Sequence, residues 1–116
     1  MRRGEIWFAD LDPSRGSESN KIRPVAIVSN DAHNRVAQRL GRGVLTVVPL
    51  TSSPRRVLTF QVLVDQESSG LPRESKAQAE QVRALDVSRL VERAGRLTRE
   101  QLAAVDDALR LHLDLS

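Results

Sequence analysis

Two short apolar segments near the start of the chain, joined by a long polar loop, constrain the fold more than any other feature. Glu5 to Ala9 and Pro24 to Ser29 are typical of β-strands, because their apolar residues alternate or form a short continuous run. The loop returns Arg23 to the entrance of the second strand. Pro24 fixes its own φ and biases Arg23 toward an extended conformation, so the guanidinium is held in place. A held guanidinium suits a phosphoryl group, since it stays charged and offers a rigid fork of donors.

The middle of the chain predicts a helix and two further strands. Asn30 and Asp31 are capping candidates, and glycines at 41 and 43 end the helical pattern. In the last strand we expect the side chains at 60, 62 and 64 to point one way, with Gln61 and Leu63 on the other face. A turn at Ser68 to Gly70 follows. The expected elements are a helix over Asp31 to Gln38 and strands over Val44 to Leu50 and Phe60 to Val64.

The C-terminal segment predicts a long helix from about Arg99 to the end. Thr98 with Gln101 three residues later forms a capping-box signature. Two apolar stripes follow, lying roughly 135° apart at about 100° per residue. One core needs only one stripe, so the second suggests a homodimer; the alternative is a helix tucked into a groove of its own subunit. The stripes are Leu102, Val105, Leu109 and Leu113, and Ala104, Ala108, Leu111 and Leu115.

Composition limits the classes of protein to consider. A chain of 116 residues is expected to form one domain with one modest core. The absence of cysteine excludes a disulfide framework and a thiol nucleophile. The only histidines are His33 and His112, and they lack metal-ligand spacing, so we expect no metal site and no cofactor. No apolar run is long enough to span a membrane, and the N-terminus lacks a signal sequence, which predicts a cytoplasmic protein.

The distribution of charge favours a nucleic acid as partner. Residues 1 to 60 carry ten Lys or Arg against five Asp or Glu, whereas residues 61 to 116 carry eight against ten. Any single surface arginine needs no special explanation, but a set in or beside loops could reach a polyanion. These loop cations are Arg15, Lys21, Arg23, Arg35, Arg39, Arg42, Arg55 and Arg56.

Five segments in register resemble the MazF/PemK family of bacterial toxin endoribonucleases. They are RGEIWFADLDP, GSE at Gly16 to Glu18, RPVAIVS, VVPLTS at Val47 to Ser52 and AEQVRAL at Ala79 to Leu85. The resemblance implies a mostly β (α+β) fold, an SH3-like partly open five-stranded barrel of the CcdB/PemK-like kind, with a short helix after strand 2 and a C-terminal helix. It also implies a homodimer, a single-stranded RNA substrate and a cognate antitoxin of MazE type.

The segment Pro72 to Leu85 can be interpreted in two ways. Its Ala, Glu, Lys and Gln content and its initial proline favour a helix. Alternation instead places Ala77 and Ala79 inward. The family resemblance also makes much of it a strand, so we predict a strand here. The residues expected on its outward row are Lys76, Gln78 and Glu80.

The resemblance also implies the reaction and its residues. It predicts sequence-specific, metal-independent cleavage that leaves a 2′,3′-cyclic phosphate and a 5′-hydroxyl and inhibits translation and growth. Such cleavage needs a base for the 2′-hydroxyl, charge stabilisation at phosphorus and a proton for the leaving oxygen. RPV carries over the catalytic arginine as Arg23, and VVPLTS the catalytic threonine as Thr51. The expected RNA-binding or auxiliary residues are Ser17, Glu18, Lys21, Ser52, Lys76, Gln78 and Glu80.

Some alternatives stay open from the sequence. Glu18 and Glu80 are both chemically eligible as the general base, whereas the pKa of arginine is too high for that role. A toxin of the same fold that acts on a protein such as DNA gyrase is a second interpretation, and an RNA-binding module that does not cut is a third. The RPV and PLTS segments favour the ribonuclease.

Overall fold

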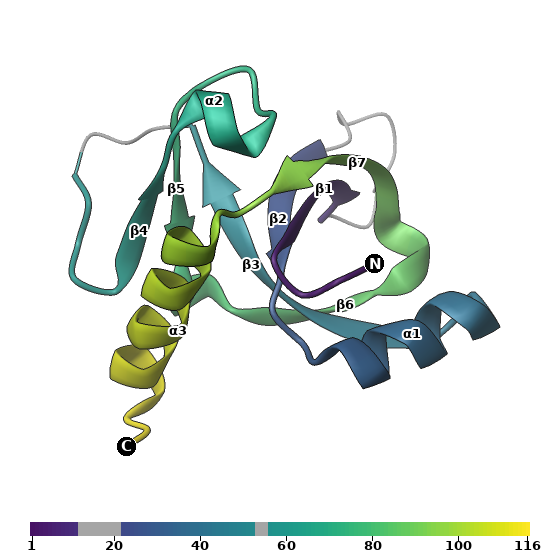
Figure 1. The fold of residues 1–116 in the computed structure, drawn as a ribbon. Coiled ribbons are helices and arrows are strands. Elements are labelled where there is room, and N and C mark those ends of the chain that lie inside the picture. Colours follow the sequence, from purple (N-terminus) through teal and green to yellow (C-terminus); the bar gives the residue numbers. More distant parts are fainter. Residues whose placement is uncertain (12–21, 53–55) are drawn as a thin grey trace.

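Strands β1 (Glu5–Asp10) and β2 (Ile22–Ile27) form an antiparallel pair inside a larger sheet (Figure 1). The computed structural model describes residues 1–11, 22–52 and 56–116. In those ranges the sheet has seven strands, the others being β3 (Val44–Thr51), β4 (Gln61–Val64), β5 (Ser75–Gln78), β6 (Arg83–Asp86) and β7 (Leu90–Arg96). The helices are α1 (Asp31–Leu40), α2 (Gln66–Ser69) and α3 (Arg99–Leu113), with short 3₁₀ turns η1 (Ala79–Gln81) and η2 (Val87–Arg89).

Strand β3 pairs with three other strands and so organises the sheet. The strand order is β4-β5-β3-β2-β1-β7, and β6 pairs with β3 beside that path. The first half of β3 pairs with β6, ending with Val47 opposite Arg83, whereas its last two residues pair with β5. The chain from β5 through η1 to β6 therefore runs antiparallel along one edge of β3.

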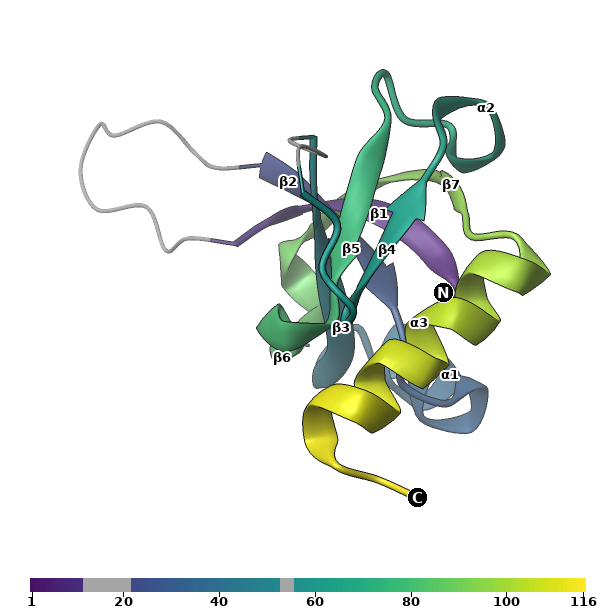
Figure 2. The same ribbon diagram turned by 90° about the vertical axis from the view of Figure 1, so that its left-hand side faces the viewer.

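The two faces of the sheet bury two separate clusters of apolar side chains. Alternate residues of β2 go to opposite clusters, Val25 and Ile27 to one and Ala26 to the other, as the period of a strand requires. The cluster that contains Ala26 includes Val105 of α3, and Figure 2 shows this helix running alongside β4. The other cluster includes Ala37 of α1. Because both faces are covered, Val25 to Val28 form a continuous apolar run, as predicted for a buried strand.

Several sequence predictions are confirmed. The first four predicted strands and the helix after β2 are present, with bounds shifted by one or two residues. The Asn30 side chain caps that helix by accepting a hydrogen bond from His33 N at 2.8 Å, and Gly41 ends it in the left-handed conformation. Residues 72–85 contain no α-helix but β5, η1 and the start of β6, with Ala77 and Ala79 buried as predicted. Pairing with β3 and β4 outweighs the local helix propensity of this segment.

Other predictions are wrong in detail. The sheet has seven strands in the described residues instead of five, because residues 83–96 add β6 and β7. The outward row predicted on one strand ends at Gln78, since the chain turns into η1 before Glu80. Gln61 is buried, although we expected it to face away from the core. Its amide bonds to Leu58 N at 3.0 Å and to Glu80 Oε2 at 2.7 Å, which satisfies its polar atoms inside the protein.

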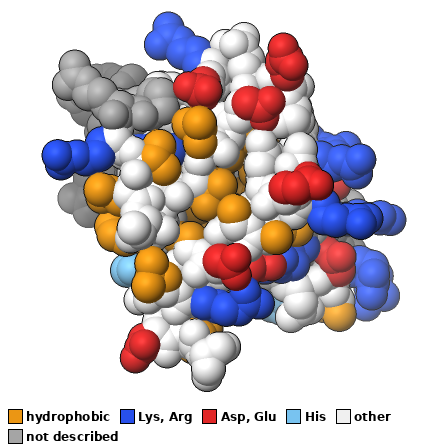
Figure 3. All heavy atoms as spheres, turned by 60° about the vertical axis from the view of Figure 1, so that its left-hand side comes forward, with side chains coloured by type: hydrophobic (Ala, Val, Ile, Leu, Met, Phe, Trp, Pro, Cys, Tyr) orange, Lys and Arg blue, Asp and Glu red, His pale blue; other side chains and the backbone are white. Residues whose placement is uncertain are grey.

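Helix α3 has the predicted capping box, and its two buried residues, Val105 and Ala108, come one from each predicted stripe. The Thr98 hydroxyl accepts from Gln101 N, and the Gln101 side chain accepts from Thr98 N. Leu102, Val105 and Leu109 pack on the core as predicted. Figure 3 shows apolar side chains among charged ones on the side of β4 and α3. The exposed large apolar residues of these segments and the approach to β4 are Val57, Leu58, Leu63, Leu111 and Leu113.

None of the helices in the described ranges has the length and apolar character that crossing a membrane would require.

Candidate active site

The register of β2 and β3 brings the two predicted catalytic residues together. Val25 lies opposite Pro49 in this antiparallel pair. Two residues further out along each strand are Arg23 and Thr51, which therefore lie across from each other and on the same face of the sheet. Arg23 is exposed at the start of β2, and Thr51 is half-buried at the end of β3.

The strands on the far side of β3 add polar side chains to the same face. Lys76 of β5 lies opposite Thr51, and Gln78 lies two residues further along β5. Arg83 of β6 lies opposite Val47. Cross-strand partners point to the same side of a sheet, so β2, β3, β5 and β6 all contribute to one surface.

A cavity of about 290 Å³ opens at this surface, where the sequence analysis predicts the reaction, and for that predicted role we call it the cleavage pocket. Arg23, Thr51 and Gln78 line it, as predicted from the sequence, together with Gln81 and Arg83. Its remaining walls are apolar and come from Leu11, Pro49 and Leu50. The pocket thus combines two guanidinium groups, two amides and a hydroxyl, which are donors suited to phosphate oxygens.

Gln81 and Arg83 are pocket residues that the sequence analysis did not single out. Both lie within the segment AEQVRAL, which served there only as a marker of the family. Arg83 is exposed and forms no ion pair with any described residue. The motif itself could have indicated Arg83, because an arginine is a residue type suited to binding phosphate.

Three other predicted residues lie apart from the cleavage pocket. The Lys76 ammonium donates to Arg56 O at 2.6 Å instead. Glu80 accepts the hydrogen bond from Gln61, and its Oε1 is buried with no hydrogen-bond partner in the described residues. Ser52 lines a neighbouring hollow of about 200 Å³ that shares Arg23 with the cleavage pocket.

Ser17, Glu18 and Lys21 lie outside the described residues, as do Arg15 and Arg55. Across the described ranges, no three His, Cys, Asp or Glu side chains gather where they could hold a metal ion. The carboxylate at the end of β6, Asp86, serves a local contact: its pKa is lowered because the side chain and backbone of Ser88 donate hydrogen bonds to it.

Residues 2–113 match the family of PemK-like, MazF-like toxins of type II toxin-antitoxin systems. The chain belongs to this family. It is 56% identical over 115 residues to "Endoribonuclease MazF9" of Mycobacterium tuberculosis, an alignment that covers 99% of this chain and 98% of that protein. It is 34% identical over 116 residues to "Endoribonuclease EndoA" of Bacillus subtilis, covering 99% and 96%.

Solved structures share the fold of this toxin. A MazE-MazF crystal structure from Deinococcus radiodurans matches with a TM-score of 0.81 and 26% identity, covering 100% of this chain and 97% of that one. The Mycobacterium tuberculosis toxin MazF-mt6 matches with a TM-score of 0.75 and 28% identity, covering 97% and 98%. The resemblance found from five short motifs is therefore confirmed over nearly the whole chain.

Proposed function

We propose that this MazF-type endoribonuclease toxin cleaves single-stranded RNA, sequence-specifically and without a metal ion, at the cleavage pocket. The observation that carries the proposal is that Arg23 of β2 and Thr51 of β3 line one pocket together. The walls of the pocket bear cations and neutral donors, which attract phosphate and repel a divalent cation. The products would be a 2′,3′-cyclic phosphate and a 5′-hydroxyl, and loss of RNA would inhibit translation and growth.

In this mechanism Arg23 neutralises the crowded, phosphorane-like transition state. Fixed positive charge in a confined site stabilises such a state more than it stabilises the substrate. Thr51 donates a hydrogen bond to a phosphate oxygen, and Gln78 and Arg83 hold the neighbouring phosphates. Ser17, Lys21, Ser52 and Lys76 are proposed as further RNA contacts.

Glu18 is the better candidate for the general base. A base must come within hydrogen-bond reach of the 2′-hydroxyl. Glu80 is engaged by Gln61 at 2.7 Å and does not line the cleavage pocket, so it would have to leave that contact to act. We therefore propose a structural role for Glu80 and the proton abstraction for Glu18, the other eligible carboxylate, which lies outside the described residues.

The partners proposed for the toxin are a second copy of itself and an acidic antitoxin of MazE type, in the cytoplasm. Relatives were crystallised as MazE-MazF complexes, which supports the antitoxin. The exposed apolar side chains near β4 and α3 support the dimer.

We infer that residues 1–116 are one domain, in which the sheet curls into an SH3-like, partly open barrel. Strands β6 and β7 are joined directly through η2, which favours this closure of the barrel.

Incubation of the protein with a long single-stranded RNA in EDTA tests the proposal. We expect cleavage at defined sites, with products that a 5′-kinase labels without phosphatase treatment. Thr51→Ala should cut more slowly, whereas Thr51→Ser, which keeps the hydroxyl, should cut faster than Thr51→Ala. Products with 5′-phosphates, or activity abolished by EDTA, would contradict the proposed chemistry. Binding of the RNA without cleavage would favour an RNA-binding module. If the protein neither binds nor cleaves the RNA, a toxin that acts on a protein would be favoured.

A further inference from the structure

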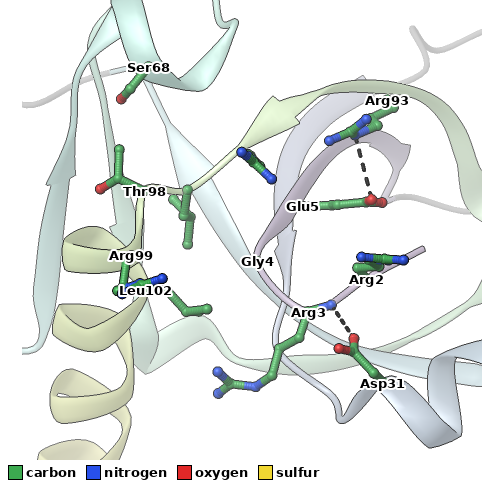
Figure 4. A pocket seen from close by; sticks show the side chains of 12 residues that line it. Arg2, Arg3, Gly4, Glu5, Asp31, Ser68, Arg93, Thr98, Arg99 and Leu102 are labelled. Carbon is green, nitrogen blue, oxygen red and sulfur yellow. Dashed lines mark hydrogen bonds and ion pairs between the residues drawn. The ribbon is translucent and has the colours of Figure 1, made fainter.

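A larger cavity, of about 670 Å³, lies at the opposite end of the central strands from the cleavage pocket. The N-terminal segment, the end of β7 and the start of α3 form its walls (Figure 4). Gly4 N donates to Ile27 O at 2.7 Å, which fixes the cavity at the last residue of β2. Arg23 lies four residues earlier on β2, roughly 13 Å away at about 3.3 Å per residue. The two cavities share no lining residue.

The carboxylates of this cavity already have partners. Glu5 accepts a hydrogen bond from Trp7 Nε1 at 2.9 Å and lies 3.7 Å from both the N-terminal ammonium and Arg93. Burial raises the pKa of Glu5, but these hydrogen-bonding and charged neighbours outweigh burial and lower it overall. Asp31 accepts from Arg3 N at 2.6 Å. Both carboxylates therefore already have partners within the cavity walls, and they do not form ion pairs with the remaining cations of the described residues.

Only some of the arginines around the cavity are used by the fold. The guanidinium of Arg3 is engaged by the fold, since it donates to Val28 O at 2.9 Å and to both carboxylate oxygens of Asp106. Arg93 is paired with Glu5. The other three, Arg2, Arg96 and Arg99, are exposed and form no hydrogen bond or ion pair through their side chains with any described residue.

The start of α3 adds to the positive potential. Arg99 occupies the first turn of this 15-residue helix, where the helix dipole favours an anion over a cation. An anion bound between Arg99 and the neighbouring arginines would offset that repulsion. The capping box satisfies Gln101 N, but the N–H groups of Arg99 and Glu100 have no acceptor among the described residues.

The floor of the cavity is apolar. Leu97 is 5% exposed, and Leu102 lies beside Gly4, whose missing side chain opens the space. A Cβ at Gly4 would lie 3.2 Å from Leu102 Cδ2. A volume of about 670 Å³ falls within the range of small-ligand pockets and greatly exceeds what a single phosphate fills. The size and the apolar floor fit a ligand with an organic ring as well as phosphates.

We propose that this cavity is a second anion site that binds a free nucleotide carrying two or more phosphates. Arg2, Arg96 and Arg99 hold the phosphoryl groups, and Leu97 and Leu102 contact the sugar or base. Three guanidinium forks match the charge and the oxygens of a diphosphate. A cavity of this volume with an apolar floor suits a small molecule with a ring better than a passing RNA strand or an acidic peptide.

Binding of ADP to the full chain tests the proposal, with calorimetry and the fluorescence of Trp7 as readouts. Trp7 is the only tryptophan, and its indole N–H contacts Glu5 of the cavity wall. We expect ADP to bind and adenosine not to bind. Arg96→Gln combined with Arg99→Gln should weaken ADP binding about tenfold or more, because each charged hydrogen bond contributes substantially. Arg42→Gln, at an exposed arginine outside the cavity, is the matched control.

Further variants distinguish this cavity from the cleavage pocket. Arg23→Gln should retain ADP binding, and the Arg96/Arg99 double variant should melt like the wild type and cut a short RNA at an unchanged rate. Equal binding of adenosine and ADP would overturn the proposal, as would ADP binding that depends on Arg23 and not on Arg96 and Arg99. The proposal would also be overturned if ADP does not bind, while the wild type binds RNA or oligoglutamate more tightly than the double variant does. That result would assign the cavity to a polymer.

Discussion

The two ends of strand β2 differ in how their side chains are used. At the Arg23 end, the arginines of the cleavage pocket form no ion pair with described residues. At the Ile27 end, which we call the anchored end, Gly4 bonds to Ile27 and the Arg3 guanidinium joins Val28 O to Asp106 of α3. These stabilising contacts lie at the anchored end, whereas the arginines at the Arg23 end are left for the proposed RNA substrate. Substitutions at the two ends should therefore separate activity from stability.

Arg23→Lys should have the largest effect on activity. Lysine keeps the positive charge but loses the bidentate fork, and losing one such stabilising group costs about 10²–10³-fold in rate. Melting should not change, because Arg23 is exposed. Initial rates on a defined RNA, with a melting curve for each variant, test this. A variant that cuts at the wild-type rate would show that the reacting phosphate lies elsewhere.

Gly95→Ala should have the largest effect on stability. A Cβ at Gly95 would lie 2.1 Å from Ser69 O, so α2 and β7 would have to move apart. Overpacking of this kind costs about 1–3 kcal/mol. Gly41→Ala is the matched control, since nothing lies within 4 Å of its Cβ position and only its left-handed backbone, at φ 66°, opposes the change. Urea titration should show the larger loss for Gly95→Ala; equal losses would mean that this close approach is not a constraint.

Arg3→Gln should destabilise the protein by about 1–2 kcal/mol, since it removes a bidentate, charge-assisted link between the N-terminus and α3. The side chains of Arg3 and Asp106 are 30% and 28% exposed, which limits screening by water. Arg110→Gln breaks an ion pair whose partners are 54% and 77% exposed, and it should cost far less. The free energies of unfolding of the two variants test the contrast. Cleavage by folded Arg3→Gln should equal that of the wild type.

The lowered pKa of Asp65 predicts a small loss of folding stability at acidic pH. The side chain of Ser68 and that of Gln101, at 2.9 Å, donate hydrogen bonds to its carboxylate and lower its pKa below the ordinary 3.8. A folded-state pKa below the unfolded one stabilises the protein above pH 3.8, and this stabilisation is lost as the pH falls toward the folded value. Asp65→Asn should therefore reduce the drop in melting temperature between pH 6 and about pH 3.

The control for Asp65→Asn is Glu100→Gln, which removes an exposed carboxylate in the first turn of α3, next to Gln101. It should leave the acid-induced drop closer to that of the wild type than Asp65→Asn does. If both variants behave alike, the link between α2 and α3 through Asp65 does not stabilise the anchored end.

Elements defined by local signals could be predicted from the sequence. The capping box at Thr98 and Gln101, the cap at Asn30 and the left-handed glycine at 41 act within a few residues, so their patterns are visible in the chain. Strand β7 was missed because its sequence, LVERAGR, lacks apolar alternation; it lies at the edge of the sheet beside β1, where half its residues face water.

Long-range pairing decided what local patterns could not. Pairing of β3 with β5 made residues 75–78 a strand against their helix propensity, and the turn into η1 carried Glu80 away from the cleavage pocket to Gln61. Pairing of β3 with β6 brought Arg83 into the pocket. The family, the apolar runs and two catalytic candidates could be identified in the sequence, since these depend on residue type and short spacing. Which polar side chains share a surface was visible only in the folded chain, because that depends on strand register between residues far apart in the sequence.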